Sequence, residues 1–130
     1  MNAVIRYLVE EKGIASNQRE AEILLTGWEI VPIQSGDTVI GHIAKNGREI
    51  HTVLFPEYRG SAKNRAVIRT YHKLLEKDVF LTTRVPVDDI ADIPMTEGVG
   101  FRETRRDGQF IYYWLDMNTV IGGKKNAQRV

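Results

Sequence analysis

The chain has 130 residues, of which 42% are hydrophobic and 27% charged, so it is long enough to bury a hydrophobic core without covalent staples. It contains no cysteine, which excludes disulfides and thiolate metal ligands. Its net charge of +1 argues against nucleic acid as the main partner, because neutralising many phosphates requires a basic excess. The three histidines, at positions 42, 51 and 72, lack metal-ligand spacing, so we expect no metal site.

The N-terminal segment, residues 1–27, predicts two short helices. Asn2 is suited to cap the first, in which apolar residues recur at helical spacing. The second begins near Ser16 or Asn17, with Glu20 completing a capping box. The segment has no long apolar run, so it reads neither as a signal peptide nor as a membrane span. We expect a cytoplasmic protein, although a virus particle assembled in the cytosol would give the same signals.

From Trp28 the pattern changes to short segments rich in Val, Ile and Thr, which predict strands. Three such segments read WEIVPIQ, TVIGHIA and EIHTVLF, and turn residues separate them. The second separator contains Asn46-Gly47, which is typical of a type I′ turn with positive φ at both central residues. We therefore expect an antiparallel meander of three strands.

The second half of the chain returns to helical spacing and then to strands. Apolar residues mark one face of a helix over residues 61–77, and VFLTTRV predicts a strand after it. A short helix is expected over residues 88–95, limited by Pro94. The segment FRETRRDGQFIYYWLDM predicts a long hairpin that turns at Asp107-Gly108, with its aromatic residues packed across strands. The order ααβββαβαββ indicates an α/β or α+β fold.

One motif lies in the stretch FPEYRGSAKNRAVI, residues 55–68. The strand that ends at Phe55 is followed by Pro56, by Arg59-Gly60 and by a basic helix. Such a turn leaves backbone N–H groups free at a helix start, which is how proteins hold phosphates. The stretch resembles the acyl-CoA binding segment of the GNAT (GCN5-related N-acetyltransferase) superfamily, whose loop reads roughly R/Q-x-x-G-x-G/A and holds the CoA pyrophosphate.

The resemblance continues over the order of elements from residue 28 to 116. The segment MTEGVGF, residues 95–101, is similar to a family segment that reads L-Y-E-K-L-G-F. The resemblance implies an α/β (α+β) fold, a single GNAT-like domain with a mostly antiparallel mixed sheet, helices on both faces and a shortened N-terminal part. Within it we expect N-terminal helices over 1–27, a core over 28–116 and a mobile tail over 117–130.

The resemblance also implies a binding site for acetyl-CoA. The implied cofactor-binding residues are Leu54, Phe55, Arg59, Gly60, Ser61, Ala62, Lys63 and Asn64. Leu54 and Phe55 would pair with the pantetheine, and the others would hold the pyrophosphate. Ala62 and Asn64 stand where the family prefers glycine, or glycine and then glycine or alanine, and a side chain there crowds the pyrophosphate or demands a left-handed backbone. Asparagine tolerates that backbone, so Ala62 is the larger departure.

Three residues are candidates for the chemistry of acyl transfer. Glu49 and His51 lie on the strand that often supplies the family's general base, and their spacing places them on one face. Either is the candidate base if that face lines the cleft, and both are surface residues if it faces solvent. Thr96 stands where many family members place the tyrosine that protonates the departing thiolate, and its hydroxyl is a poorer acid than a phenol.

Two functions follow from these observations. In the first, the protein transfers an acetyl group from acetyl-CoA to an amine that the sequence does not identify. In the second, it is a catalytically degenerate bacteriophage virion or head-assembly protein that acts through contacts with phage or host proteins. The stretch RRDGQFIYYW is similar to small GNAT-like proteins of tailed bacteriophages, and the run RETRR is a candidate contact surface. Arg59-Gly60 favours the first function, whereas Ala62 and Thr96 favour the second.

Overall fold

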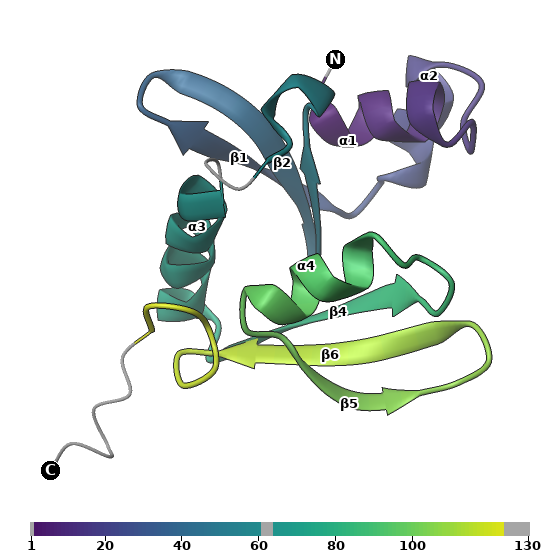
Figure 1. Ribbon diagram of the computed structural model, residues 1–130. Helices are drawn as coiled ribbons and strands as arrows, with labels where there is room; N and C mark the ends of the chain where they lie inside the picture. The colour runs from purple at the N-terminus through teal and green to yellow at the C-terminus, as the bar shows by residue number, and fades with distance from the viewer. Residues whose placement is uncertain (1, 61–63, 124–130) are drawn as a thin grey trace, which may run out of the picture. The chain divides into compact units, whose positions relative to one another are not determined.

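Six strands and four α-helices make up the part of the chain that the computed structural model describes, residues 2–60 and 64–123 (Figure 1). The elements are α1 (Ala3–Arg6), the π-helical turn η1 (Tyr7–Glu11), α2 (Gln18–Leu24), β1 (Glu29–Ser35), β2 (Thr38–Asn46), β3 (Glu49–Leu54), the 3₁₀ turn η2 (Pro56–Tyr58), α3 (Asn64–Lys77), β4 (Phe80–Pro86), α4 (Asp92–Gly98), β5 (Arg102–Arg106) and β6 (Phe110–Asp116). The predicted order of helices and strands and the α+β class are confirmed. The chain divides into two compact units, Met1–Ala66 and Val67–Val130.

Asparagine side chains cap the N-termini of both α-helices of the first unit. The Oδ1 atom of Asn2 accepts a hydrogen bond from the Ile5 N–H at 2.8 Å, and that of Asn17 accepts one from the Glu20 N–H at 2.9 Å. Each bond satisfies a donor that the first helical turn leaves without a partner. The Glu20 carboxylate reaches back to the Ser16 N–H at 3.2 Å, one residue before the position expected for a capping box. These caps fix the segment that carries η1.

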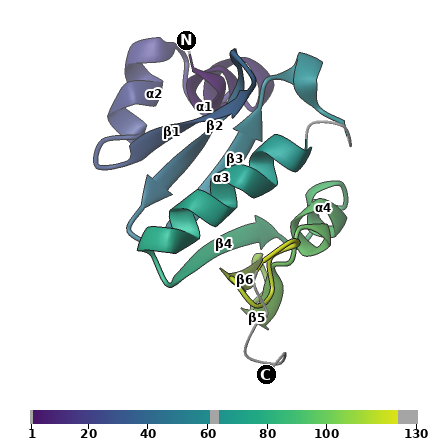
Figure 2. The same cartoon turned by 90° about the vertical axis from the view of Figure 1, so that its left-hand side faces the viewer.

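The three strands of the first unit form the predicted antiparallel meander, with α1 and α2 beside it (Figure 2). The turn between β2 and β3 differs from the type I′ prediction. Asn46 still belongs to β2 and pairs with Glu49, so Gly47 and Arg48 are the central residues of the turn. Only Gly47 has a positive φ, 61°. Because Asn46 pairs with Glu49 in the ladder, it belongs to the strand, and Gly47 occupies the first central position of the turn.

Gly41 allows β3 to approach β2 closely where the candidate site begins. It pairs with Leu54, and a Cβ atom at Gly41 would lie 2.4 Å from the carbonyl oxygen of Val53. The Phe55 N–H then donates to the Ile40 carbonyl at 2.9 Å, and η2 turns the chain away from the strand. Pro56 opens η2, where a missing N–H costs no hydrogen bond. The end of β3 is therefore fixed by backbone contacts.

The second unit contains an antiparallel sheet in the order β4-β6-β5, with β5 at one edge (Figure 1). Side chains of β6 alternate between a buried face and a half-buried face. On the buried face, the ring of Tyr113 contacts Phe101, which in turn contacts Tyr71 of α3. The buried aromatic and aliphatic residues of this unit include Tyr71, Leu81, Val85, Phe101, Ile111, Tyr113 and Leu115. The hairpin and its cross-strand packing agree with the prediction.

Two segments of the second unit differ from their predicted form. The helix α4 begins at Asp92, and Pro94 lies in its first turn. A proline there removes a donor that has no helical partner, so Pro94 does not limit the helix and α4 continues to Gly98.

The other difference lies after β6, where residues 117–123 pack against the unit although a mobile tail was expected from 117 on. Val120 is fully buried, and the Ile121 N–H donates to the Val99 carbonyl at 3.0 Å. The remainder of that tail, residues 124–130, lies outside the described residues. Among the described residues, no helix is long and apolar enough to cross a membrane.

Candidate functional site

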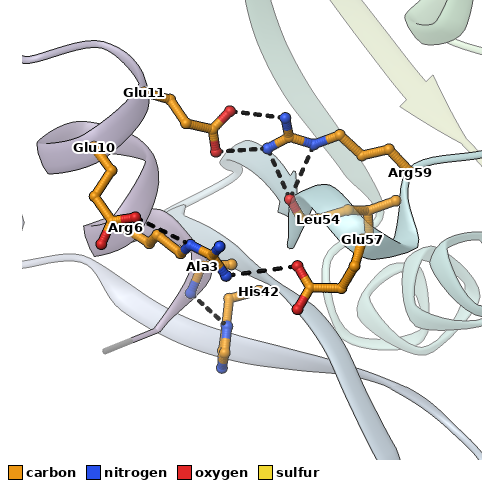
Figure 3. Close-up of polar contacts among 8 residues, drawn as sticks. All are labelled: Ala3, Arg6, Glu10, Glu11, His42, Leu54, Glu57 and Arg59. Atoms are coloured by element: carbon orange, nitrogen blue, oxygen red, sulfur yellow. Dashed lines mark hydrogen bonds and ion pairs between the residues drawn. The ribbon is translucent and has the colours of Figure 1, made fainter.

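Arg59, which the motif assigns to the cofactor, has its guanidinium group engaged within the first unit (Figure 3). Its Nη1 and Nη2 atoms donate to the two carboxylate oxygens of Glu11 at 2.7 and 2.8 Å. Its Nε and Nη2 atoms also donate to the carbonyl oxygen of Leu54 at 3.1 and 2.9 Å. A carbonyl oxygen has two lone pairs, so these two donors use its ordinary capacity. The guanidinium group of Arg59, which the motif assigns to a phosphate, therefore binds the Glu11 carboxylate and the carbonyl at the end of β3.

Electrostatics reinforces this pair. The hydrogen bond from Arg59 holds the pKa of the Glu11 carboxyl below its usual value, and the same bond raises the pKa of Arg59. The two side chains are 41% and 26% exposed, for Arg59 and Glu11 respectively, so water screens the pair only in part. Bidentate pairing also fixes the orientation of both groups. An anion that approaches Arg59 must compete with Glu11.

A second ion pair connects the same two segments. The guanidinium of Arg6 lies 3.5 Å from the Glu57 carboxylate and 3.4 Å from that of Glu10 (Figure 3). It also lies over the ring of Phe55, 5.8 Å from the centroid. The N-terminal helical segment is therefore joined to the chain around η2 at two places, through Arg6 and through Glu11.

His42 completes the surroundings of Phe55. Its Nδ1 atom accepts a hydrogen bond from the Ala3 N–H at 3.1 Å, and its ring meets the Phe55 ring edge-on at 5.8 Å (Figure 3). Burial lowers the pKa of His42, and the positive charge of the N-terminus adds to that effect. A lone pair that accepts a hydrogen bond requires the neutral ring at that nitrogen. His42 therefore acts in the fold as a neutral acceptor beside Phe55.

Glu49 and His51 lie together on β3. The Nε2 atom of His51 is 2.6 Å from a carboxylate oxygen of Glu49, and the His51 ring lies 5.6 Å from the ring of Trp28. Their side chains are about one third exposed, 33% for Glu49 and 36% for His51. A carboxylate that accepts the Nε2 proton selects the tautomer in which Nδ1 carries the basic lone pair. The pair has the arrangement of a carboxylate-oriented base, and its catalytic role stays a prediction.

Thr96 lies in the second unit, in α4, with only 9% of its surface exposed. The next residue, Glu97, accepts a hydrogen bond from the hydroxyl of Tyr113 at 2.9 Å. Burial, followed by this bond to Glu97, raises the pKa of Tyr113 to about 12. A solvent-open hollow of about 440 Å³ is lined in part by Glu97, so water reaches its carboxylate. Tyr113 is a buried phenol that keeps its proton.

The rest of the predicted loop is described only in part. Gly60 has open space around it, because a Cβ atom added there would meet nothing within 4 Å. Asn64 is the first residue of α3. Ser61, Ala62 and Lys63 lie outside the described residues, so their predicted contacts with a pyrophosphate stay predictions.

Sequence reasoning missed the acidic partners of these residues. Glu11 is 48 residues before Arg59, and no local pattern predicts that pairing. The pairing of Arg6 with Glu57 and the bond between Tyr113 and Glu97 were missed for the same reason, because the two partners in each case come from different elements. Within the described ranges, no group of three or more His, Cys, Asp or Glu side chains is placed to hold a metal ion.

Comparison with solved structures identifies the fold. The protein PH1933 from Pyrococcus horikoshii OT3 superposes with a TM-score of 0.63 at 13% identity, over 88% of this chain and 87% of that one. A GNAT family acetyltransferase from Elizabethkingia anophelis, solved with acetyl-CoA bound, gives 0.57 at 9% identity, over 78% and 84%. A proposed GNAT acetyltransferase from Desulfovibrio desulfuricans gives 0.58 at 17% identity, over 87% and 90%. No family model matches the sequence, and no curated protein is similar to it in sequence.

The chain therefore has the fold of the GNAT acetyltransferases, as the resemblance predicted. At these identities the likeness extends to the fold, and the bound acetyl-CoA is a property of the Elizabethkingia protein. None of these comparisons supports the predicted link to bacteriophage proteins.

Proposed function

We propose that the protein is an acyl-CoA-dependent N-acetyltransferase that transfers an acetyl group to an amine. The observation that supports this function best is the GNAT fold together with β3 leading through η2 to Arg59 and Gly60, just before α3. The resemblance to the GNAT superfamily implies that this order of elements forms the cofactor segment.

The donor atoms of Arg59 fit a phosphate. The Glu11 carboxylate acts as an internal stand-in, because a guanidinium that binds two carboxylate oxygens presents the same pair of N–H groups to two phosphate oxygens. We propose that Arg59 exchanges Glu11 for the pyrophosphate and releases the Leu54 carbonyl to a pantetheine amide. Gly60 and the residues 61–64 would add backbone N–H groups at the start of α3. Leu54 and Phe55 would lie along the pantetheine.

His51 is the better candidate for the general base, with Glu49 as the group that orients it. Acetyl-CoA supplies the activated thioester. An ammonium substrate must lose a proton before its nitrogen can attack, and the Nδ1 atom of His51 is the basic site when Nε2 donates to Glu49. Alignment provides most of the rate, because an amine and a thioester react readily once they are held together. Thr96 is a weak acid, so we propose that water protonates the thiolate.

Calorimetric titration of the protein with CoA and acetyl-CoA tests the cofactor site. We expect micromolar binding by the parent, loss of binding in Arg59→Ala, and unchanged binding in Arg106→Ala. Arg106 is a matched control, since it forms a bidentate pair with Glu103 at the same distances. A parent protein that binds neither compound at millimolar concentration would refute this function.

Substitution of the proposed base tests the chemistry separately from binding. In the parent, we expect acetylation of a panel of amines, measured as release of free thiol. His51→Gln is expected to lower kcat while CoA binding is retained. Glu49→Gln should lower kcat less, because it removes the orienting group and leaves the imidazole. Equal kcat in His51→Gln and the parent would remove His51 from the mechanism.

One observation favours the second candidate function, a non-catalytic interaction protein. The guanidinium of Arg59 donates hydrogen bonds to the Leu54 carbonyl and to the Glu11 carboxylate, so the fold needs no ligand at this position. In that case the GNAT fold serves as a scaffold for protein contacts, with a phage particle as one proposed setting. Absence of CoA binding in both the parent and Glu11→Gln would favour this alternative.

A further inference from the structure

One face of the sheet β4-β6-β5 combines aromatic rings with arginines. The half-buried positions of β6 carry Phe110, Tyr112 and Trp114. Across the ladder, Tyr112 pairs with Arg84 of β4 and Arg105 of β5, and Trp114 pairs with Arg102 of β5. Directly opposed residues of antiparallel strands place their side chains on the same face. We call this surface the arginine–aromatic face: Arg84, Arg102, Arg105, Phe110, Tyr112 and Trp114.

Two arginines of this face lie over aromatic rings. The guanidinium carbon of Arg105 is 3.7 Å from the centroid of the Tyr112 ring, and that of Arg84 is 5.0 Å from the centroid of Phe110. Both side chains are exposed. Stacking on a ring orders a long side chain in advance, and the N–H edges of the Arg105 guanidinium suit carboxylates or phosphates. The face therefore presents an arginine that is already oriented.

Charge is divided between the two faces of β5. Glu103 and Arg106 pair with residues of the buried side of β6 and form an ion pair at 2.7 Å. Arg102 and Arg105 are on the arginine–aromatic face, opposite Trp114 and Tyr112. The charges on one face of β5 therefore neutralise each other, whereas the opposite face carries the guanidinium groups of Arg102 and Arg105.

The carboxylates at the margins of the arginine–aromatic face are engaged with its own donors. Asp116 accepts from the indole N–H of Trp114 at 3.1 Å. Asp107 accepts from the hydroxyl of Tyr112 at 2.9 Å and from two backbone N–H groups of the turn. Those backbone bonds are the main cause of the lowered pKa of Asp107. Asp116 is the last residue of β6 and Asp107 lies in the turn before it, so both carboxylates lie at the margins and the middle of the face is positive.

The composition of the face indicates a protein partner rather than a nucleic acid. Trp, Tyr and Arg dominate the energetically important positions of protein interfaces. Base stacking requires open ring faces, but here Arg105 covers Tyr112, and Trp114 stacks on Phe80 with 3.9 Å between centroids and 7° between planes. A second copy applying the same face would oppose arginine to arginine. These contacts favour an anionic protein segment.

We propose that the arginine–aromatic face binds an acidic segment of another protein, with its carboxylates on the guanidinium groups of Arg102 and Arg105 and its apolar side chains against Trp114. An extended segment suits this surface, because alternate residues of a strand point to one side and would place carboxylates at regular intervals. The site lies in the second unit and does not depend on the proposed acetyltransferase activity.

Fluorescence anisotropy with a labelled synthetic peptide of alternating Glu and Val tests this site. We expect Arg105→Ala to weaken binding by roughly tenfold, as for a residue at the centre of an interface, and Arg102→Ala to weaken it as well. Arg106→Ala is the matched control, because it removes the same charge from the same strand on the opposite face. A peptide of alternating Gln and Val should not bind. Circular dichroism would check that each variant is folded.

Four results would overturn the proposal. The first is failure of the parent to bind the Glu-Val peptide. The second is equal weakening by Arg105→Ala and Arg106→Ala, which would indicate attraction by overall charge. The third is tighter, Arg105-dependent binding of a single-stranded oligothymidylate, which would assign the face to nucleic acid. The fourth is self-association in sedimentation that Arg105→Ala abolishes, which would assign the face to a second copy.

Discussion

Two arginine–glutamate pairs in this protein have the same geometry and different consequences. Arg59 with Glu11, and Arg106 with Glu103, each make two N–H bonds to a carboxylate at 2.7 and 2.8 Å. The first pair joins segments 48 residues apart and also holds the carbonyl of Leu54, whereas the second joins residues three apart on one exposed strand. Bond geometry alone therefore does not indicate which pair determines structure. Sequence separation and burial distinguish them.

The physical difference lies in what each pair orders. In both, the arginine bond lowers the pKa of the glutamate, so the sign of the electrostatic effect is the same. An exposed pair between near neighbours restrains little and is screened by water and salt. The pair of Arg59 and Glu11 closes a long loop of chain and fixes the residue that the GNAT motif assigns to the cofactor. Removing each partner in turn tests this contrast.

The largest effect is expected from Arg59→Ala. This change leaves the Glu11 carboxylate and the Leu54 carbonyl without their donors, so we expect the free energy of unfolding to fall by about 1–2 kcal/mol after allowance for solvent screening. Urea denaturation followed by circular dichroism would measure it. Arg106→Ala should leave the denaturation midpoint unchanged. If the two variants lost equal stability, the contrast between the two pairs would not hold.

The next effect is an increase of cofactor affinity in Glu11→Gln, and it rests on the proposed function. The neutral amide competes less for Arg59 than the carboxylate does, so we expect CoA to bind about threefold to tenfold more tightly. Glu103→Gln should leave the affinity as in the parent. Titration calorimetry on both variants measures the change. Parent-like or weaker binding by Glu11→Gln would show that Glu11 does not compete for Arg59.

Acid should weaken the first pair in a pH window that the lowered pKa of Glu11 sets. The pKa of Glu11 is lower in the fold than its ordinary 4.5. Its contribution to stability is therefore complete above about pH 4.5 and is lost as pH falls through the lowered value. We expect Glu11→Gln to lose less stability than the parent when urea midpoints are compared between about pH 6 and pH 3. Parallel curves for the two proteins would contradict this linkage.

The smallest effect is expected at His42, in a higher pH window. Its pKa is below the ordinary 6.5 in the fold, mainly through burial. The unfolded chain takes up the proton first as pH falls, so stability from the neutral ring is present above about pH 6.5 and is lost progressively below it. We expect His42→Asn, which keeps a polar side chain, to flatten the stability profile between about pH 7.5 and pH 5.5. A profile identical in slope to that of the parent would exclude His42 as the source.

Much of the fold was predictable because its signals are local. Asn2 and Asn17 cap helices, alternation marks the strands, and Asp107 opens the hairpin turn, since each feature depends on neighbours within a few residues. The contact of Glu49 with His51 follows in the same way, because residues two apart on a strand share a face. The candidate loop was also predictable as a motif, through Arg59 and Gly60.

Only the tertiary structure decided which partners these residues have. The sequence determined the order of elements, the fold class and the presence of a basic residue after β3. Pairing of Arg59 with Glu11, of Tyr113 with Glu97, and of Arg105 with the ring of Tyr112 depends on chain packing and strand register. Such contacts between separate elements leave no periodic trace in the chain, because many alternative partners satisfy the same local pattern. The folded chain selects one partner for each residue, because burial and strand register bring only that partner within hydrogen-bond or ring contact.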